Sequence, residues 1–332
     1  MDTSVEYVGF KLPHPFIVGA GPLADSLESA RKAEDAGAAA IVMRSLFEEQ
    51  IDAEGLATLN STDTHAESFG EALSYFPEQD EFVIGPQEYL ELVRKMKEGM
   101  SIPVFASLNG YTPGGWLDYA VQIEQAGADG LELNLYYVAV NPAESAQQIE
   151  QRKVEMVREV RRAVRIPITV KLSPFYTSLA HFACELEGAG ADGLVLFNRF
   201  FESDLDIEEL EVIPRLNLSY SGEILLRLRW LAVLSGTLPR TCLAVTGGVH
   251  SGVDAVKAIM TGASAVQVVS ALLRKGCESL SRIKAEMVQW MEEKEYDSVQ
   301  QMRGSMDLAH CPKPEEFARA NYARTLQTWQ SE

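Results

Sequence analysis

The chain alternates between short runs of apolar residues and longer stretches in which apolar residues recur every three or four positions. The first pattern is typical of buried strands and the second of amphipathic helices. Four times, a helical stretch ends in a glycine followed by alanine and passes directly into an apolar run. The glycine suits a helix end, and its small neighbours let helix and strand pack closely. These four units are EDAGAAAIVMRS (34–45), EQAGADGLELNLYY (124–137), EGAGADGLVLFNR (187–199) and MTGASAVQVVSAL (260–272).

Four further apolar runs complete a predicted set of eight strands. Their apolar residues are continuous rather than alternating, which is typical of parallel strands covered on both faces. The four runs cover 15–22, 102–110, 166–174 and 242–248, and the predicted helices cover 26–36, 87–99, 115–126, 144–164, 177–188, 221–236 and 253–261. We therefore predict an α/β fold, a (β/α)8 TIM barrel with its core at about 15–272, near the typical size of roughly 250 residues. A doubly wound open sheet is the alternative.

Two loops are longer than a barrel needs. Residues 46–101 exceed one crossover helix, so about 46–86 are expected to form an extended loop after the second strand. That loop is either a lid over the barrel mouth or a dimerisation or packing element. The acidic run at 202–211, after the sixth strand, is expected to be a solvated edge.

The C-terminal part is expected to be a helical extension, at 273–332. Amphipathic patterns predict helices at 281–296 and 314–329, whose aromatic residues pack on the barrel rather than bind a cofactor. No proline-rich or serine-rich linker interrupts the sequence, so we expect a single barrel domain over 1–332.

Composition narrows the class of protein further. The net charge of 29 − 48 = −19 disfavours nucleic acid and anionic membranes as partners. The sequence contains no apolar run of about 18 residues that could span a bilayer, and the first ten residues do not resemble a signal peptide. Its four cysteines lack C-x-x-C spacing, so we expect no iron–sulfur or zinc site in this chain and a cytoplasmic location.

In a (β/α)8 barrel the chemistry lies where the strands pass into the following loops. The predicted strand ends are Ala20-Gly21, Arg44-Ser45, Asn109, Asn134, Lys171, Asn198, Gly247-Gly248 and Ser270-Ala271. This set has no cluster of histidines or carboxylates, so we predict no metal site. Three asparagines suit a flat heterocycle that bears C=O and N–H groups. Three roles are open for Lys171. It could stabilise negative charge that develops on such a ring, form a Schiff base with a carbonyl substrate, or form a structural ion pair.

Small residues follow the last two predicted strands. Backbone N–H groups at Gly247-Gly248 and Ser270-Ala271 can approach a phosphate closely, and the helix N-termini beyond them favour negative charge. The loops after strands 7 and 8 frequently form a phosphate site in this fold. We therefore predict a phosphate-bearing ligand at this end.

These motifs together resemble the dihydroorotate dehydrogenase family of FMN barrels, over about residues 8–290. The matching segments are PFIVGAG, AIVMRS, LELNLYY, VKLSP, LVLFNR and TGGVHSGVDAVKAIMTGASAVQVVSALL. The resemblance implies that Lys171 stabilises the reduced flavin near its N1, and that Asn134 and Asn198 edge both flavin and substrate. The other cofactor-binding residues that it implies are Ala20, Gly21, Arg44, Ser45, Asn109, Gly222, Gly247, Gly248, Ser270 and Ala271.

The chain departs from that family where the substrate and the catalytic base are expected. The family continues its fourth strand as Asn-Leu-Ser-Cys-Pro-Asn with Cys, or Ser, as the base, whereas this chain continues from Asn134 as Leu-Tyr-Tyr-Val-Ala. Tyr137 stands in the place of the base, although a phenol with a reference pKa near 10 accepts protons poorly at neutral pH. Asn141 and Arg199 are the remaining candidates for substrate contacts. Arg44 replaces a family lysine, which keeps the charge but excludes proton transfer.

The resemblance implies an FMN-dependent oxidoreductase that moves a hydride between flavin and a CH–CH bond of a small ring. Dihydroorotate to orotate, a step of pyrimidine biosynthesis, is the named candidate. The electron acceptor would be a small molecule or a separate redox protein, and the resemblance implies a homodimer. Two alternatives stay open: a flavin-free lyase or aldolase that uses Lys171, and a non-catalytic FMN-binding partner subunit.

Overall fold

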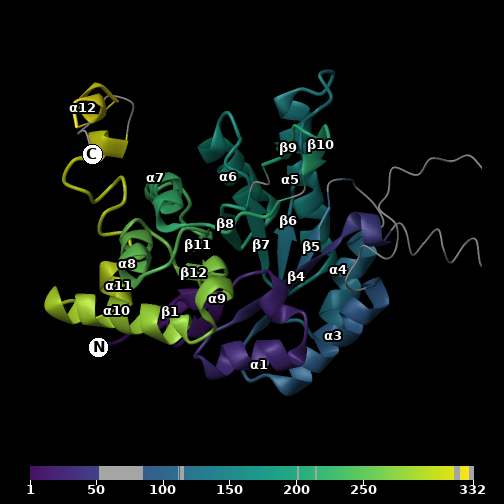
Figure 1. The fold of residues 1–332 in the computed structure, drawn as a ribbon, viewed down its shortest axis with the longest axis horizontal. Helices are drawn as coiled ribbons and strands as arrows, with labels where there is room; N and C mark the ends of the chain where they lie inside the picture. Colours follow the sequence, from purple (N-terminus) through teal and green to yellow (C-terminus); the bar gives the residue numbers. More distant parts are fainter. Residues whose placement is uncertain are drawn as a thin grey trace, which may run out of the picture.

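Eight parallel strands form a closed barrel in the computed structural model, which describes residues 1–51, 85–110, 112, 116–199, 202–213, 215–317 and 322–328. The strands follow one another around the barrel in chain order, and the last pairs with the first (Figure 1). They are β3 (Phe16–Val18), β4 (Ile41–Phe47), β5 (Val104–Asn109), β6 (Gly130–Asn134), β7 (Ile168–Leu172), β8 (Gly193–Leu196), β11 (Cys242–Thr246) and β12 (Ala265–Val268). The predicted (β/α)8 barrel and all eight of its strands are confirmed.

Helices cover the outside of the barrel where the apolar periodicity predicted them. They are α1 (Leu27–Asp35), α3 (Pro86–Gly99), α4 (Trp116–Gln125), α5 (Ala146–Ala163), α6 (Leu179–Ala189), α7 (Ile224–Ser235) and α8 (Gly252–Met260). Serine hydroxyls cap three of them by accepting the backbone N–H three residues on, at Ser26, Ser145 and Ser251. Gly190 ends α6 in the left-handed conformation that a helix-terminal glycine allows.

One predicted boundary is wrong. The last barrel strand was expected to reach Leu272, but β12 ends at Val268 and a short helix, α9 (Ser270–Lys275), follows. The apolar run therefore spans two elements, because buried helical and strand residues look alike over so few positions.

An N-terminal hairpin, which the sequence did not predict, closes the floor of the barrel. It consists of β1 (Val5–Tyr7) and β2 (Phe10–Leu12). The Val8 N–H donates to the Cys242 Sγ at 3.4 Å, and the Phe10 ring packs on Phe105 with centroids 5.7 Å apart. Cys242 and Phe105 lie near the starts of their strands, so the hairpin covers the amino end of the barrel and leaves the site to the carboxyl end.

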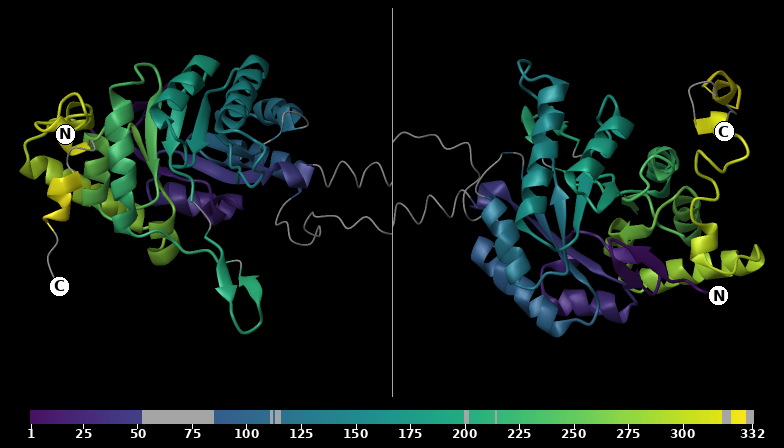
Figure 2. Two further views of the ribbon diagram at one scale, coloured as in Figure 1. Left: turned by 90° about the horizontal axis from the view of Figure 1, so that it is seen from above. Right: turned by 180° about the vertical axis from the view of Figure 1, so that it is seen from behind.

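A second hairpin stands out from the barrel after β8. It consists of β9 (Asp204–Asp206) and β10 (Glu211–Ile213), and it projects away from the barrel body (Figure 2). Its residues are exposed or half-buried, as expected for the acidic run at 202–211. Most of the extended loop after the second strand falls at 52–84, outside the described residues, so its predicted role as lid or packing element stays a prediction.

In the C-terminal extension, the first of the two predicted helices is confirmed. The helix predicted at 281–296 is α10 (Ser279–Glu293), whose Trp290 stacks on Tyr296 and packs partly buried against the core. Of the helix predicted at 314–329, the described residues form a 3-10 turn, η4 (Pro314–Phe317), and a short α-helix, α12 (Tyr322–Leu326), while 318–321 and 329 lie outside the described residues. The prediction is wrong at its first turn, and the rest of it stays a prediction outside α12. The remaining short elements are η1 (Pro22–Ala24), η3 (Ser221–Glu223) and α11 (Val299–Met302). Within the described ranges, no helix combines the length and the apolarity that crossing a membrane requires.

Candidate active site

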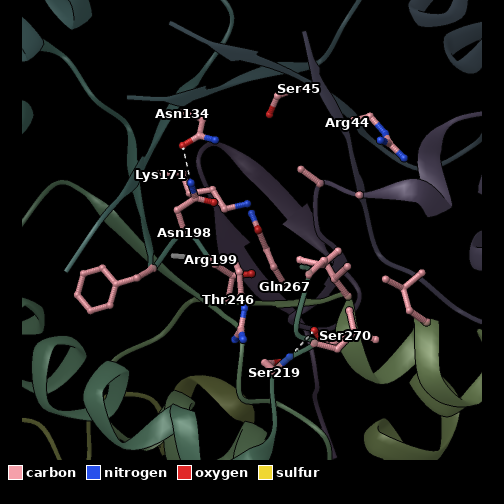
Figure 3. A pocket seen from close by; sticks show the side chains of 18 of the residues that line it. Arg44, Ser45, Asn134, Lys171, Asn198, Arg199, Ser219, Thr246, Gln267 and Ser270 are labelled. Atoms are coloured by element: carbon pink, nitrogen blue, oxygen red, sulfur yellow. Dashed lines mark hydrogen bonds between the residues drawn. The ribbon is translucent and has the colours of Figure 1, made fainter. Parts of the chain in front are cut away.

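A cavity of about 320 Å³ lies at the carboxyl end of the barrel, and every barrel strand or its following loop contributes to its wall. This volume lies within the range of small-molecule sites. Eleven of the residues that the sequence predicted line it together (Figure 3): Ala20, Gly21, Arg44, Ser45, Asn109, Asn134, Lys171, Asn198, Arg199, Gly247 and Ser270. The parallel register sets Asn134 beside Asn109 on one side and beside Lys171 on the other.

Five predicted residues do not line this cavity. Gly222 lies in η3, where a Cβ would meet the Tyr220 ring, and Ala271 is buried in α9. Gly248 is buried and donates its N–H to Ser219 Oγ, and Asn141 is exposed, with its Oδ1 accepting the Ala143 N–H. Tyr137, the fifth, lies on a different cavity.

Two amides and a lysine face the cavity at its β6, β7 and β8 side. Asn198 Nδ2 donates to Asn134 Oδ1 at 3.1 Å (Figure 3). This bond orients both side chains. It leaves the Nδ2 amide group of Asn134 as a donor and the Oδ1 atom of Asn198 as an acceptor for a ligand. Lys171 is buried beside them, at the end of β7. The geometry thus offers donors, acceptors and a cation along one edge, as a heterocycle with C=O and N–H groups requires.

A buried carboxylate supports this lysine from inside the barrel. Lys171 Nζ lies 3.3 Å from Glu132 Oε1, and Gln267 Nε2 donates to Glu132 Oε2 at 2.7 Å. Glu132 has no exposed surface, so the pair lies in a low-dielectric interior where its geometry is tightly held. Gln267 Oε1 is also buried and accepts no hydrogen bond from the described residues. Because Gln267 lines the cavity, an N–H group of a ligand would suit this oxygen.

The opposite end of the cavity is built from glycines, serines and an arginine; we call it the glycine end, formed by Gly247, Gly248, Ser219, Ser270 and Arg227. Gly247 and Gly248 have φ of +78° and +81°, a region that disfavours side chains. A Cβ on Gly248 would lie 2.5 Å from the backbone nitrogen of Ile224. Ser219 Oγ accepts the Gly248 N–H at 3.2 Å, and Ser270 Oγ accepts the Ser219 N–H at 3.1 Å.

Arg227 brings a buried positive charge to the glycine end. Its Nε donates to the Thr246 carbonyl and its Nη1 to the Glu223 carbonyl, both at 2.6 Å. It forms no ion pair with a carboxylate of the described residues, and burial lowers its pKa. A cation held by backbone carbonyls beside glycine N–H groups suits a phosphate.

The N-terminus of α8, which follows β11, was expected to favour a bound phosphate, but its backbone N–H groups already have a partner. Asp254 accepts the backbone N–H groups of His250 and Ser251, both at 3.0 Å. The carboxylate therefore already occupies the positive end of α8, and the anion-binding groups are the glycines, the serines and Arg227 instead.

Both rim arginines are ion-paired. Arg44 makes a two-point contact with Asp25, with Nε to Oδ1 at 2.7 Å and Nη2 to Oδ2 at 2.5 Å. Arg199 Nη1 lies 2.6 Å from Glu223 Oε2. Their charges are largely balanced, so an anionic substrate would have to compete with Asp25 or Glu223 for them.

The two neighbouring tyrosines after β6 differ in the cavities that they line. A second cavity of about 410 Å³ lies between this loop and residues 173–177; Tyr136 lines both cavities, whereas Tyr137 lines only the second. Tyr137 donates its hydroxyl proton to Glu144, which also accepts from Arg152 at 2.7 Å. The bond to Glu144 raises the pKa of Tyr137. In this arrangement Tyr137 neither faces the main cavity nor favours the proton-accepting form, and its role as the base stays a prediction.

Several residues that build the site were not predicted from the sequence, chiefly Tyr136, Glu132, Gln267 and Arg227. Three of them carry a signal, because each is a polar residue inside an apolar run, although Arg227 shares its run with Arg229. Glu132 and Gln267 interrupt apolar strands, and Arg227 lies in the apolar stretch of α7. A polar group inside such a run must find a partner. Tyr136 carried no comparable signal beside Tyr137.

Comparisons with known proteins agree with this geometry. The family model described as dihydroorotate dehydrogenase matches residues 82–291. The catalytic subunit of dihydroorotate dehydrogenase B (NAD(+)) from Thermoplasma volcanium is 26% identical over 307 residues, which cover 91% of this chain and 98% of the relative. The same subunit from Methanosarcina acetivorans is 28% identical over 302 residues, 89% of this chain and 93% of the relative. The NAD-dependent dihydropyrimidine dehydrogenase subunit PreA from Escherichia coli K12 is 23% identical over 323 residues, 91% of this chain and 76% of the relative.

Proposed function

The chain belongs to the dihydroorotate dehydrogenase family, and from this premise we propose that it is an FMN-dependent oxidoreductase. It moves a hydride between the flavin and a CH–CH bond of a small planar ring. One observation carries the proposal. A single cavity joins an anion-binding glycine end to an edge of amides and a buried lysine, which matches a phosphate-bearing heterocycle.

The glycine end fits the phosphate of FMN. Gly247 and Gly248 bring backbone close to the cavity where side chains would collide, since a Cβ on Gly247 would lie 2.8 Å from Arg227 Nη2. Arg227 supplies charge, and the hydroxyls of Ser219 and Ser270 supply hydrogen bonds. Arginine suits phosphate because its planar fork can bind two oxygens at once.

The remaining wall fits the flavin ring. Gln267 Oε1 offers an unmatched buried acceptor, and Asn134 and Asn198 offer a donor and an acceptor. Gly19 and Gly21 bring bare backbone against Val269, because a Cβ at either position would lie 2.9 or 3.1 Å from that side chain. The missing side chains therefore let Val269, which lines the cavity, pack closely on this backbone.

Bound FMN would supply the hydride chemistry, as flavins do. Lys171 would hold positive charge where a reduced ring gathers negative charge. Its pairing with Glu132 suits the charged ammonium, whereas Schiff-base chemistry needs the neutral amine. The apolar side chains of Phe47, Phe197 and Leu216 line the cavity, and Phe197 is buried among them.

Dihydropyrimidines are the ring class that we propose as substrate. Dihydroorotate and the dihydropyrimidine in the relatives' names share a saturated CH–CH bond in one ring. Dihydroorotate is the first candidate, and its carboxylate would have to displace Asp25 or Glu223 from a rim arginine. A separate redox protein or a small molecule would exchange electrons with the flavin.

Binding of FMN and of riboflavin, which lacks the phosphate, tests the cofactor assignment. We expect FMN to bind at least about 100-fold more tightly, because each charge-assisted hydrogen bond to phosphate contributes about 1.5–3 kcal/mol. Arg227→Met should bring the FMN affinity close to that of riboflavin and leave riboflavin binding unchanged. Arg229→Met, on the exposed face of the same helix, is the matched control. Equal affinities in the wild type, or no binding of either compound, would contradict the proposal.

A further inference from the structure

We propose that the second cavity, between the loop after β6 and the loop after β7, binds a small organic carboxylate with an apolar body. Lys153 and Tyr176 hold the carboxylate, and the apolar wall covers the body of the ligand. This site lies beside the cavity of the proposed function and takes a different ligand, so it adds a second binding activity to the barrel mouth.

The wall of this cavity contains a buried lysine. Lys153, on α5, is 5% exposed and lines the cavity. Its ammonium carries three N–H donors. One of them donates to the Tyr176 hydroxyl oxygen at 3.1 Å, and among the described residues Lys153 has no other hydrogen bond and no ion pair. Burying a cation away from any counter-ion costs free energy, so this part of the wall is complementary to an anion.

Tyr176 provides a second donor next to Lys153. Its hydroxyl oxygen accepts from Lys153, and its own proton has no acceptor among the residues that the structure describes. Burial raises the pKa of Tyr176, so the hydroxyl keeps that proton at neutral pH. The ring stacks on Phe182 with centroids 4.4 Å apart, which holds the hydroxyl in place. An N–H and an O–H donor therefore lie side by side, as the two oxygens of a carboxylate require.

The rest of the wall offers apolar surface. Val138, Ala139, Ala146 and Ile149 line it, and Val138 is 51% exposed. Contact with an apolar ligand would take this surface out of water, which is favourable. The cavity of about 410 Å³ is large enough for a compact organic molecule. An inorganic anion would leave the apolar surface wet, so the lining favours an organic one.

The charges of the lining favour a single negative charge on the ligand. Lys153 is the one cation among the described residues that line this cavity, and Glu150 lines it as well. Glu144, the other lining carboxylate, already accepts from Arg152 at 2.7 Å. A phosphate dianion would gain one cation and meet repulsion from Glu150, whereas a carboxylate needs only one positive charge. The cavity therefore suits a monocarboxylate better than a phosphate.

Binding at this site is expected to depend on pH through Lys153. Burial lowers the pKa of Lys153 to about 8, Arg152 lowers it further, and Glu150 raises it. The other titratable groups of the described lining are Tyr137, Glu144 and Tyr176. A carboxylate bound to Lys153 favours the ammonium and so raises this pKa. The affinity should therefore be constant well below pH 8 and fall about tenfold per pH unit above it.

Calorimetric titration with two matched compounds tests the site. The full chain, supplemented with FMN, is titrated with benzoate and with benzamide, which has the same ring and no charge. We expect benzoate to bind at least about tenfold more tightly, because its hydrogen bonds are charge-assisted. Lys153→Met should remove this difference, and Lys294→Met, at an exposed position, should keep it. Glu150→Gln should tighten benzoate binding, because a like charge is removed.

Proton uptake in the wild type gives a measurement that needs no variant. Benzoate titrations in buffers of different ionisation heat report how many protons the protein takes up on binding. We expect uptake of a substantial fraction of a proton at pH 8.5, where the free Lys153 is mostly neutral, and almost none at pH 6.

Three results would overturn the proposal. The first is no measurable binding of benzoate, or equal affinities for benzoate and benzamide. The second is benzoate binding that Lys153→Met leaves unchanged, because the anion would then lie elsewhere, as at the arginines of the main cavity. The third is a benzoate affinity that stays flat from pH 6 to pH 10 with no proton uptake.

Discussion

The two ends of the cavity are held in different ways. At the glycine end, backbone conformation decides the structure: Gly247 and Gly248 have positive φ and lie against Ile224 and Arg227. At the other end, which we call the tyrosine end (134–145), side chains mostly bind one another, as Tyr137 and Arg152 bind Glu144. Its loop is open to solvent, with Val140 80% exposed. The structure of the glycine end is thus set by backbone conformation, whereas that of the tyrosine end is set by the orientation of a few side chains.

The largest loss of stability is expected when the buried ion pair between Lys171 and Glu132 is broken. Lys171→Met leaves the fully buried Glu132 without its counter-ion, which should cost about 3–5 kcal/mol of unfolding free energy. Lys171→Met combined with Glu132→Gln should recover much of that stability, because no buried charge is left. Urea unfolding of the wild type, both single variants and the double variant measures the coupling. Additive losses would show that the pair is not coupled.

Gly248→Ala tests whether backbone decides the glycine end. A side chain at φ +81° and a Cβ at 2.5 Å from Ile224 N should together cost about 3 kcal/mol, and should weaken FMN binding. Gly188→Ala is the control, since Gly188 lies on an exposed helical turn of α6 and its Cβ would meet no atom within 4 Å. That control should gain about 0.5–1 kcal/mol from helix propensity. Thermal unfolding measures both, and an unaffected Gly248→Ala would remove the contrast between the ends.

Lys153, which lines the second cavity next to the tyrosine end, gives this side of the barrel mouth a pH dependence above pH 8. Burial lowers the pKa of Lys153, below the second cavity, from 10.5 to about 8. Below pH 8 both folded and unfolded chains hold this proton, but between pH 8 and 10.5 mainly the unfolded chain does, so stability rises with pH in that window. The full gain is at most about 3 kcal/mol.

Lys153→Met isolates that gain. We expect this variant to lose the rise that the wild type shows between pH 8 and pH 10 in urea unfolding, whereas the exposed Lys294→Met keeps it. Parallel curves for the wild type and Lys153→Met would contradict the assignment.

The smallest effect is expected from Tyr137→Phe. It removes one hydrogen bond at a half-buried site, which should cost about 1 kcal/mol in thermal unfolding. FMN affinity should not change, because Tyr137 does not line the main cavity. A loss of FMN binding larger than about tenfold would show that the two cavities are not separate in solution.

The sequence predicted the fold and the glycine end well because both depend on local pattern. Helix-ending glycines followed by apolar runs marked the strands, and strand ends then located Asn134, Lys171 and Gly247 together. It predicted the tyrosine end poorly, because which cavity Tyr137 lines depends on the path of the loop after β6. The helix expected at 314–329 begins as a 3-10 turn, η4, for a third reason. The residues of that turn are exposed or half-buried, so little packing supports an α-helix there.

The visible absorption spectrum of FMN-supplemented, gel-filtered protein under anaerobic conditions tests the central claim most directly. We expect flavin bands to remain with the protein and to bleach on reduction. Protein that leaves the column without flavin bands would contradict the assignment of this cavity as an FMN site.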